Sequence, residues 1–181
     1  PRATRTELGG CPVTTSDRSK SMTNHILFLC TGNYYRSRFC EEYFNHRARC
    51  LGLPWRADSR GLAPDVDVFR NPGPISPATL QRLTKLGASP GASLRYPRSV
   101  QSADLARADR IVALSRHEHQ PMVERFFPTY GPLVEYWEVG DLPLETPAHA
   151  LEKMTRLVER LVDELQPETE RIAAFAPAPA S

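Results

Sequence analysis

The chain has 181 residues, of which 40% are hydrophobic, and this is enough material for the core of one domain. Its formal net charge is only +2 and its basic residues are scattered, so the composition predicts no nucleic-acid partner. No window approaches the roughly 18 unbroken apolar residues of a membrane span. The N-terminus also lacks the apolar core of a signal peptide. We therefore expect a cytoplasmic protein without a membrane partner.

The two ends of the chain differ in composition from its centre. Residues 1–21 are polar and lack periodicity, which predicts a disordered arm or an extension upstream of the domain. Residues 167–181 are polar and then rich in alanine and proline, which predicts a flexible tail. The domain itself is expected to occupy residues 22–166.

Strand and helix patterns alternate within the domain. Apolar runs predict strands at 26–30, 55–59, 110–114 and 134–139. Helical spacing and capping residues predict helices at 37–51, 76–86, 102–106, 121–127 and 146–165. This alternation predicts an α/β fold, a single-domain three-layer α/β/α structure with a four-stranded parallel sheet and flanking helices. Ligands of such sheets bind at the carboxyl ends of the strands, which here carry Cys30, Ser59, Ser115 and Asp141.

The loop after the first strand has the features of a phosphate site. The strand stops at Cys30, and Gly32 and Asn33 then tolerate the unusual φ/ψ angles that turn backbone amides inward. The following helix start adds the positive end of its dipole. Arg36 offers a bidentate, permanently charged fork, and the same field favours the thiolate of Cys30. The predicted phosphate-binding residues are Thr31, Gly32, Asn33, Tyr34, Tyr35 and Arg36.

A second Cys-x5-Arg pattern shows how much the context matters. Cys50 and Arg56 have the same spacing, but no apolar strand precedes them. Their intervening loop contains Pro54, which has no N–H to donate. We therefore assign the site to Cys30 alone.

Residues 26–37, Ile-Leu-Phe-Leu-Cys-Thr-Gly-Asn-Tyr-Tyr-Arg-Ser, resemble the N-terminal motif of the low-molecular-weight protein tyrosine phosphatase family. The resemblance extends from Asn24 to about Gln166 and weakens with distance from the loop. It implies a phosphomonoester hydrolase in which Cys30 forms a cysteinyl-phosphate intermediate. Arg36 and the loop amides would hold the equatorial oxygens, and Ser37 would hydrogen-bond the sulfur. The partner would be a phosphorylated protein or a small phosphate ester, and the oligomeric state is not predicted.

The departing oxygen of a phosphate ester needs a proton, which a carboxylic acid can supply. We interpret Asp141 as this acid, because it follows a strand end and resembles the family's Asp-Pro motif. The match has one extra residue before the proline, and a surface turn aspartate is the alternative interpretation. Glu138 is the second candidate acid, and Asp65 and Asp67 in the long loop are further candidates.

Metal and cofactor sites are not predicted. The four cysteines form no disulfide framework and no Cys-x2-Cys zinc pair. His117 and His119 could share a face, but no third ligand follows at a telling spacing, so we interpret both as surface residues. The resemblance likewise implies no metal and no cofactor.

Several positions depart from the family pattern. Tyr35 replaces the second cysteine that often protects the nucleophile as a disulfide. The family's histidine that braces the loop asparagine has no evident counterpart, although Ser59 could take part in that bracing. The aromatic residues with which the family commonly grips a phosphotyrosine ring are not evident either, because Asp65 stands near the long-loop tryptophan position and Leu142 replaces a tyrosine. Tyr34 itself could supply stacking. Phosphatase chemistry is therefore the broader prediction and phosphotyrosine specificity the narrower one.

Three other functions remain open on this scaffold. An arsenate reductase would need resolving cysteines, and no cysteine lies beyond Cys50. A phosphocarrier would not need Arg36 or a leaving-group acid. A non-catalytic oxyanion-binding module would fit the altered acid loop.

Overall fold

The computed structural model describes residues 23–88, 90, 94–141 and 145–166. The predictions for residues 1–21 and 167–181 lie outside these ranges. A four-stranded sheet has the order β2-β1-β3-β4, and every neighbouring pair is parallel. Its strands are β1 (Asn24–Cys30), β2 (Trp55–Gly61), β3 (Arg110–Ala113) and β4 (Val134–Tyr136).

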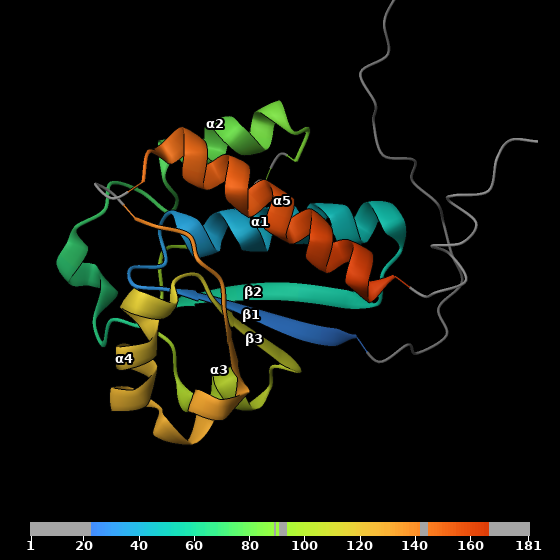
Figure 1. Cartoon of the computed structure of the whole chain (residues 1–181). Coiled ribbons are helices and arrows are strands. Elements are labelled where there is room, and N and C mark those ends of the chain that lie inside the picture. Colours follow the sequence, from blue (N-terminus) through green and yellow to red (C-terminus); the bar gives the residue numbers. More distant parts are fainter. Residues whose placement is uncertain (1–22, 89, 91–93, 142–144, 167–181) are drawn as a thin grey trace, which may run out of the picture.

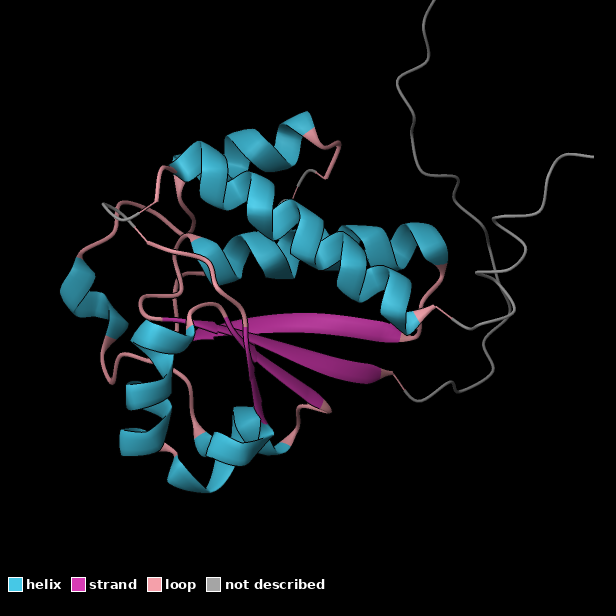
Figure 2. Ribbon diagram, in the orientation of Figure 1, coloured by secondary structure: helices cyan, strands magenta, loops and turns pink. Residues whose placement is uncertain are grey.

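The helices cover both faces of this sheet (Figure 1). One face carries α1 (Arg36–Leu51), α2 (Pro77–Lys85) and α5 (Pro147–Leu165). The other face carries α3 (Ser102–Ala106) and α4 (Arg116–Phe126). Two short 3-10 helices complete the elements, η1 (Val66–Phe69) and η2 (Pro128–Leu133). Figure 2 shows the strands between the two helical layers, so the predicted three-layer α/β/α fold is confirmed.

The unbroken apolar run of β1 follows from its central place in the sheet. Side chains of a strand alternate between the faces, and both faces are covered here. Ile26 and Phe28 belong to the core cluster under α1 and α5. Leu27 and Leu29 belong to the cluster on the other face. Cys30 ends this strand at the edge where the site lies.

The prediction for α4 was wrong about where the helix begins. We expected a turning segment up to His119 and a helix from Pro121, but the helix starts at Arg116 and contains the proline. Ser115 caps it by accepting a hydrogen bond from the Glu118 N–H at 3.4 Å. His119 and Val123, four residues apart, are both buried on its inner face, and this packing keeps the segment helical through the proline.

β4 is shorter than predicted, since it ends at Tyr136 and not at residue 139. Its partner β3 ends at Ala113, and the chain then turns into α4, so the ladder has no further strand to pair with. Beyond β4, Glu138 forms an isolated antiparallel bridge with Ser115. This bridge holds the segment after β4 next to the start of α4.

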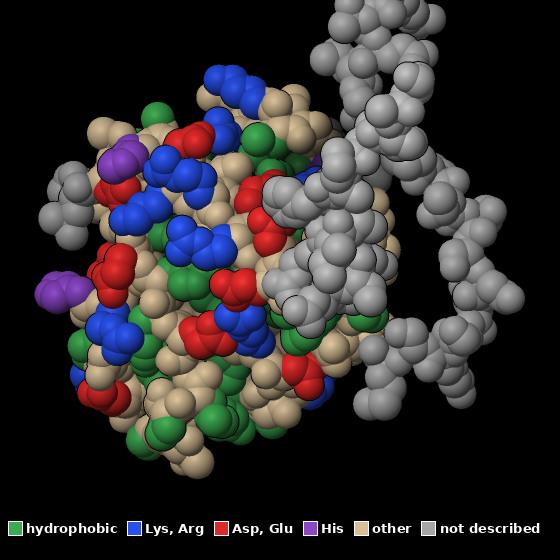
Figure 3. All heavy atoms as spheres, turned by 45° about the vertical axis from the view of Figure 1, so that its right-hand side comes forward, with side chains coloured by type: hydrophobic (Ala, Val, Ile, Leu, Met, Phe, Trp, Pro, Cys, Tyr) green, Lys and Arg blue, Asp and Glu red, His purple; other side chains and the backbone are tan. Residues whose placement is uncertain are grey.

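The surface in Figure 3 mixes acidic and basic side chains with no large area of one sign. Among the helices in the described ranges, none combines the length and the apolarity that a membrane-spanning segment needs.

Candidate active site

A cavity of about 630 Å³ opens at the carboxyl end of the sheet. The loop after β1 forms its floor, while η1, α4 and the segment before α5 contribute to its walls. Its lining includes Cys30, Thr31, Arg36, Phe69, Glu118 and Asp141. The structure therefore brings the predicted acid, Asp141, to the same cavity as Cys30 and Arg36, although 105 residues separate it from Arg36.

The sulfur of Cys30 is the meeting point of two hydrogen-bond partners. The backbone N–H of Asn33 donates to Cys30 Sγ at 3.3 Å, and Ser37 Oγ lies 3.0 Å from the same sulfur. Asn33 reaches this geometry with a left-handed φ of 50°, which asparagine tolerates better than most residues. The backbone amide of Asn33 is thus folded toward the sulfur.

The orientation of the Asn33 side-chain amide determines which of its neighbours donate hydrogen bonds to it and which accept them. Its Oδ1 accepts from Arg95 Nη1 at 2.9 Å and from the Arg98 N–H at 3.0 Å. Its Nδ2 must therefore point the other way, and it donates to Ser37 Oγ at 3.1 Å and to Ser59 Oγ at 2.8 Å. Because Ser37 Oγ already accepts from Asn33, its own hydrogen is available for the sulfur of Cys30. Two donors therefore converge on Sγ, an arrangement that suits a negatively charged sulfur.

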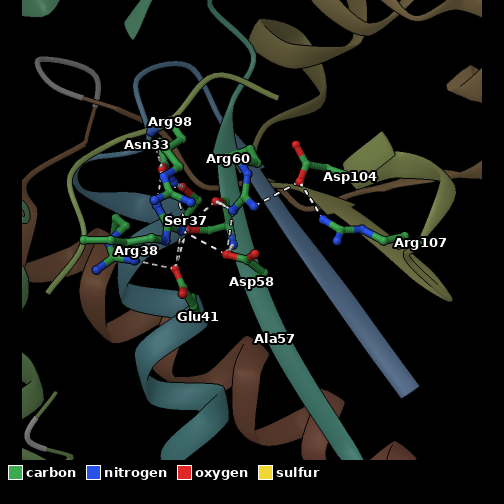
Figure 4. A network of polar contacts seen from close by, with 12 residues as sticks. Asn33, Ser37, Arg38, Glu41, Ala57, Asp58, Arg60, Arg98, Asp104 and Arg107 are labelled. Carbon is green, nitrogen blue, oxygen red and sulfur yellow. Dashed lines mark hydrogen bonds and ion pairs between the residues drawn. The ribbon is translucent and has the colours of Figure 1, made fainter. Parts of the chain in front are cut away.

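A network of charged side chains supports the loop from behind (Figure 4). Arg38 and Glu41 are buried in it, whereas Arg95 and Asp58 are partly exposed. Arg95 Nη2 donates to Glu41 Oε2 at 2.8 Å and to Asp58 Oδ1 at 3.1 Å. Glu41 also accepts from Arg38 at 2.6 Å and from Ser59 Oγ at 2.6 Å. Buried charges are tolerated when they are paired and hydrogen-bonded in this way. The network ties the loop to α1 and β2.

Arg95 is a residue that the sequence analysis missed. The expected brace of Asn33 had no evident counterpart beyond Ser59, and the structure places both Ser59 and Arg95 on its side chain. Arg95 lies in an irregular segment without periodicity, so no pattern singled it out. Only the folded chain brings it back to the loop.

Arg36 is almost fully buried, with 1% of its side chain exposed, and meets two carboxylates. Its Nη1 and Nη2 donate to the two oxygens of Glu118 at 3.0 and 2.8 Å. Nη2 also donates to Asp141 Oδ2 at 2.6 Å, and Nη1 to the carbonyl of Val139 at 3.1 Å. Burial alone would raise the pKa of Glu118, but the hydrogen bonds and charge of Arg36 outweigh it and lower the pKa. Glu118 is therefore a carboxylate at neutral pH.

The four candidate acids lie in different places. Asp141 lines the cavity and is half-exposed beside Arg36. Glu138 is 64% exposed, faces Arg116 at 3.9 Å and lines a different hollow. Asp65 and Asp67 also line another hollow. Of these four, the structure brings only Asp141 to the cavity of Cys30.

The prediction that His119 is a surface residue was wrong, whereas His117 is exposed. The His119 ring is fully buried, and its Nδ1 accepts from the Ser115 N–H at 2.9 Å. Its Nε2 therefore carries the hydrogen and faces Thr31 Oγ1 at 3.4 Å. Burial and the charge of Arg36 lower the pKa of His119 to about 4, so the ring is neutral. In the described ranges, no three His, Cys, Asp or Glu side chains are grouped to hold a metal ion.

The cavity also has an aromatic wall, in which Phe69 is a residue that the sequence analysis did not find. Phe69 lies so close to the loop that a Cβ at Gly32 would sit 3.2 Å from its ring, so a glycine permits this approach. Phe69 as a whole is 45% exposed, and it lines the cavity. Tyr34 and Tyr35 also line it, and their hydroxyls donate to the carbonyls of Pro72 and Pro147. Burial, together with the nearby charge of Asp141, raises the pKa of Tyr35 to about 12, so this hydroxyl stays neutral.

The chain is similar to several solved structures. A low-molecular-weight protein tyrosine phosphatase from T. tengcongensis has 26% identity and a TM-score of 0.65, covering 78% of this chain and 99% of its own. YfkJ from Bacillus subtilis has 20% identity and a TM-score of 0.69, with 82% and 98% covered. The YwlE arginine phosphatase from Geobacillus stearothermophilus has 18% identity and a TM-score of 0.62, with 86% and 99% covered. No curated protein matched the chain.

A comparison with family models agrees with the fold and with the sequence of the loop. The model described as low molecular weight phosphotyrosine protein phosphatase matches residues 25–174, which is most of the chain. The family scaffold is that of a cysteine-based phosphatase. The protein therefore belongs to the low-molecular-weight protein tyrosine phosphatase family.

Proposed function

We propose that the protein hydrolyses phosphomonoesters through a cysteinyl-phosphate formed on Cys30. The observation that carries this proposal is the convergence of the Asn33 N–H and the Ser37 hydroxyl on Cys30 Sγ, beside the guanidinium of Arg36. A thiolate held by donors at the floor of a cavity is a suitable nucleophile for phosphorus.

In the first step, Sγ attacks the phosphorus in line with the leaving oxygen. The S–P bond forms, the P–O bond breaks, and Asp141 gives its proton to the departing oxygen. The loop amides of 31–36 and Arg36 hold the equatorial oxygens while charge develops on them. In the second step, Asp141 takes a proton from a water molecule while the water oxygen attacks the phosphorus. The new O–P bond forms, the S–P bond breaks, inorganic phosphate leaves and Cys30 returns to the thiolate. Ser37 donates its hydrogen bond to the departing sulfur of Cys30.

The substrate is proposed to be an aryl phosphate, such as phosphotyrosine in a protein or a small aryl ester. Phe69 presents an exposed ring at the cavity, and Tyr34 lines the same space. Aromatic rings of this kind pack favourably against a phenyl leaving group.

Phosphoarginine is a second candidate substrate. Glu118 and Asp141 place two carboxylates on the cavity wall, and these would favour a cationic leaving group. One structurally similar protein is an arginine phosphatase. Matched peptides carrying phosphotyrosine or phosphoarginine would rank the two candidates by kcat/KM.

The test is hydrolysis of p-nitrophenyl phosphate, with and without a metal chelator. We expect turnover that the chelator does not reduce, and a loss of at least roughly 10⁴-fold in Cys30→Ser, because the nucleophile is removed. Cys40→Ala is the matched control, since Cys40 is a buried core cysteine. Activity that survives Cys30→Ser, or that the chelator removes, would contradict the mechanism.

The same experiment separates the remaining alternatives. A binding module would retain phosphate, measured as protection of Cys30 from alkylation by iodoacetate, without any turnover. A phosphocarrier would accumulate a phosphorylated Cys30 that water does not release. Multiple turnovers would exclude both.

A further inference from the structure

The guanidinium of Arg36 is occupied on two sides. The two carboxylate oxygens of Glu118 accept hydrogen bonds from the edge of the guanidinium formed by its terminal nitrogens, at 3.0 Å from Nη1 and 2.8 Å from Nη2. The carbonyl of Val139 takes the second hydrogen of Nη1, and Asp141 takes the second hydrogen of Nη2. A guanidinium has five N–H groups, four of them on its two terminal nitrogens. In Arg36 each of these four meets an oxygen acceptor.

The two carboxylates differ in how firmly they are held. Glu118 lies in the first turn of α4, its backbone N–H bonds the cap Ser115, and its side chain is 23% exposed. Its carboxylate makes two parallel hydrogen bonds, which is the strong geometry for this pair. Asp141 is 42% exposed and reaches Arg36 with one oxygen. An incoming phosphoryl group would therefore displace Asp141 and leave Glu118 in place.

We propose that Glu118 is a positioning residue: it holds Arg36 end-on, and by neutralising its charge it makes the loop favour the transition state over ground-state phosphate. The proposal rests on the phosphatase function proposed above. Glu118 touches no reacting atom and acts through Arg36.

The charge argument concerns the ground state. A phosphate dianion that has displaced Asp141 from Arg36 meets the Arg36–Glu118 ion pair, which has no net charge, so its attraction to the guanidinium is weak. The loop amides and the α1 dipole still bind it, and they need no help from a net positive charge.

The geometric argument concerns the transition state. Arg36 helps only if its remaining donors face the equatorial oxygens as they spread around phosphorus. Glu118 and the Val139 carbonyl fix the opposite edge of the guanidinium, so its orientation does not depend on the substrate. Interactions that are stronger in the transition state than in the ground state raise kcat and not affinity.

The experiment uses Glu118→Gln in the full chain. Glutamine keeps the length of the side chain, but removes the charge and replaces one acceptor by an NH₂ group that faces Arg36. We expect kcat for p-nitrophenyl phosphate to fall roughly 10²-fold, because small misplacements of catalytic groups have effects of this size. The competitive Ki of inorganic phosphate should tighten about five-fold, because the guanidinium regains a net charge. Orthovanadate, which imitates the pentacoordinate state, should not gain in this way.

The deciding quantity is the ratio of the phosphate Ki to the vanadate Ki. We expect this ratio to fall at least five-fold in Glu118→Gln. Glu118→Asp keeps the charge but is one methylene too short for both nitrogens, so kcat should fall while the phosphate Ki stays near wild type. Glu124→Gln is the matched control, an exposed carboxylate on the same helix, and should change none of these constants.

Two results would overturn the inference. If both Ki values change by the same factor, or if only the melting temperature falls, Glu118 has a structural role alone. An unchanged kcat in Glu118→Gln would have the same meaning. Failure of the parent proposal looks different: the wild-type protein would then show no turnover, even if phosphate protects Cys30 from iodoacetate, and the positioning role would fail with it.

Discussion

Arg36 and Arg95 both lie close to the loop after β1, and they have partners of different kinds. Arg36 faces the cavity, and its partners Glu118 and Asp141 are carboxylates that line the same space. Arg95 lies behind the loop, where Asn33, Glu41 and Asp58 accept its hydrogen bonds. The same side chain type can therefore face the cavity or hold the loop at the cavity floor, depending on where its partners lie.

This difference predicts two classes of variant. Changes of the exposed cavity residues Asp141 and Phe69 should alter turnover and leave the free energy of unfolding nearly unchanged, because these side chains face water. Changes behind the loop should lower the free energy of unfolding, because they leave buried charges without partners.

The largest expected effect is on the cavity side, at Asp141. Asp141→Asn should lower kcat for an aryl phosphate about 10²- to 10⁴-fold, because the leaving oxygen loses its proton donor. Its urea unfolding midpoint should stay near that of the wild type. Glu138→Gln is the matched control, since this exposed carboxylate lies outside the cavity. Equal losses in both variants would mean that Asp141 is not the specific acid.

Behind the loop, Arg95→Met should lower the free energy of unfolding by about 3 kcal/mol. The variant removes the hydrogen bonds to Asn33 and leaves the buried Glu41 with fewer partners. Urea denaturation would measure the change. Arg107→Met is the control, because this arginine is 73% exposed and should contribute at most about 0.5 kcal/mol. Similar stability losses for the two variants would remove the distinction between the two sides of the loop.

The pH dependence of the free energy of unfolding tests whether the buried ring of His119 is neutral in the folded protein. The folded pKa of His119 is about 4 and its unfolded value is 6.5, so between these pH values the unfolded chain binds more protons. Lowering the pH from 6.5 to 4 should therefore remove about 3 kcal/mol of the free energy of unfolding. His119→Asn, whose Oδ1 can accept from the Ser115 N–H, should lose less over this range. His117→Asn should follow the wild type, because His117 is exposed.

The smallest effect is expected at the aromatic wall. Phe69→Ala should raise KM for an aryl phosphate about five-fold, because ring contacts of this kind contribute about 1 kcal/mol. KM for a small alkyl phosphate should change little. Tyr96→Ala is the control, since this exposed tyrosine is outside the cavity lining. A shift in both substrates would mean that Phe69 shapes the loop and does not contact the leaving group.

The sequence by itself determined the sheet, the helical layers and the loop from Cys30 to Ser37. Each depends on local patterns: apolar runs for buried strands, helical spacing for the covering helices, and residues that tolerate turned backbone between a strand and a helix start. Asp141 could be proposed because it follows a strand end in a turn. These features need only a few neighbouring residues to be recognised.

Only the tertiary structure decided what surrounds the loop. Glu118, Arg95, His119 and Phe69 reach it from α4, from an irregular segment and from η1, and no spacing in the sequence connects them to Cys30. Pro121 pointed to a helix start, whereas the packing of His119 and Val123 extends α4 through it. The reason is physical: a hydrogen bond or an ion pair depends on distance in space, and a chain pattern reports only distance along the chain.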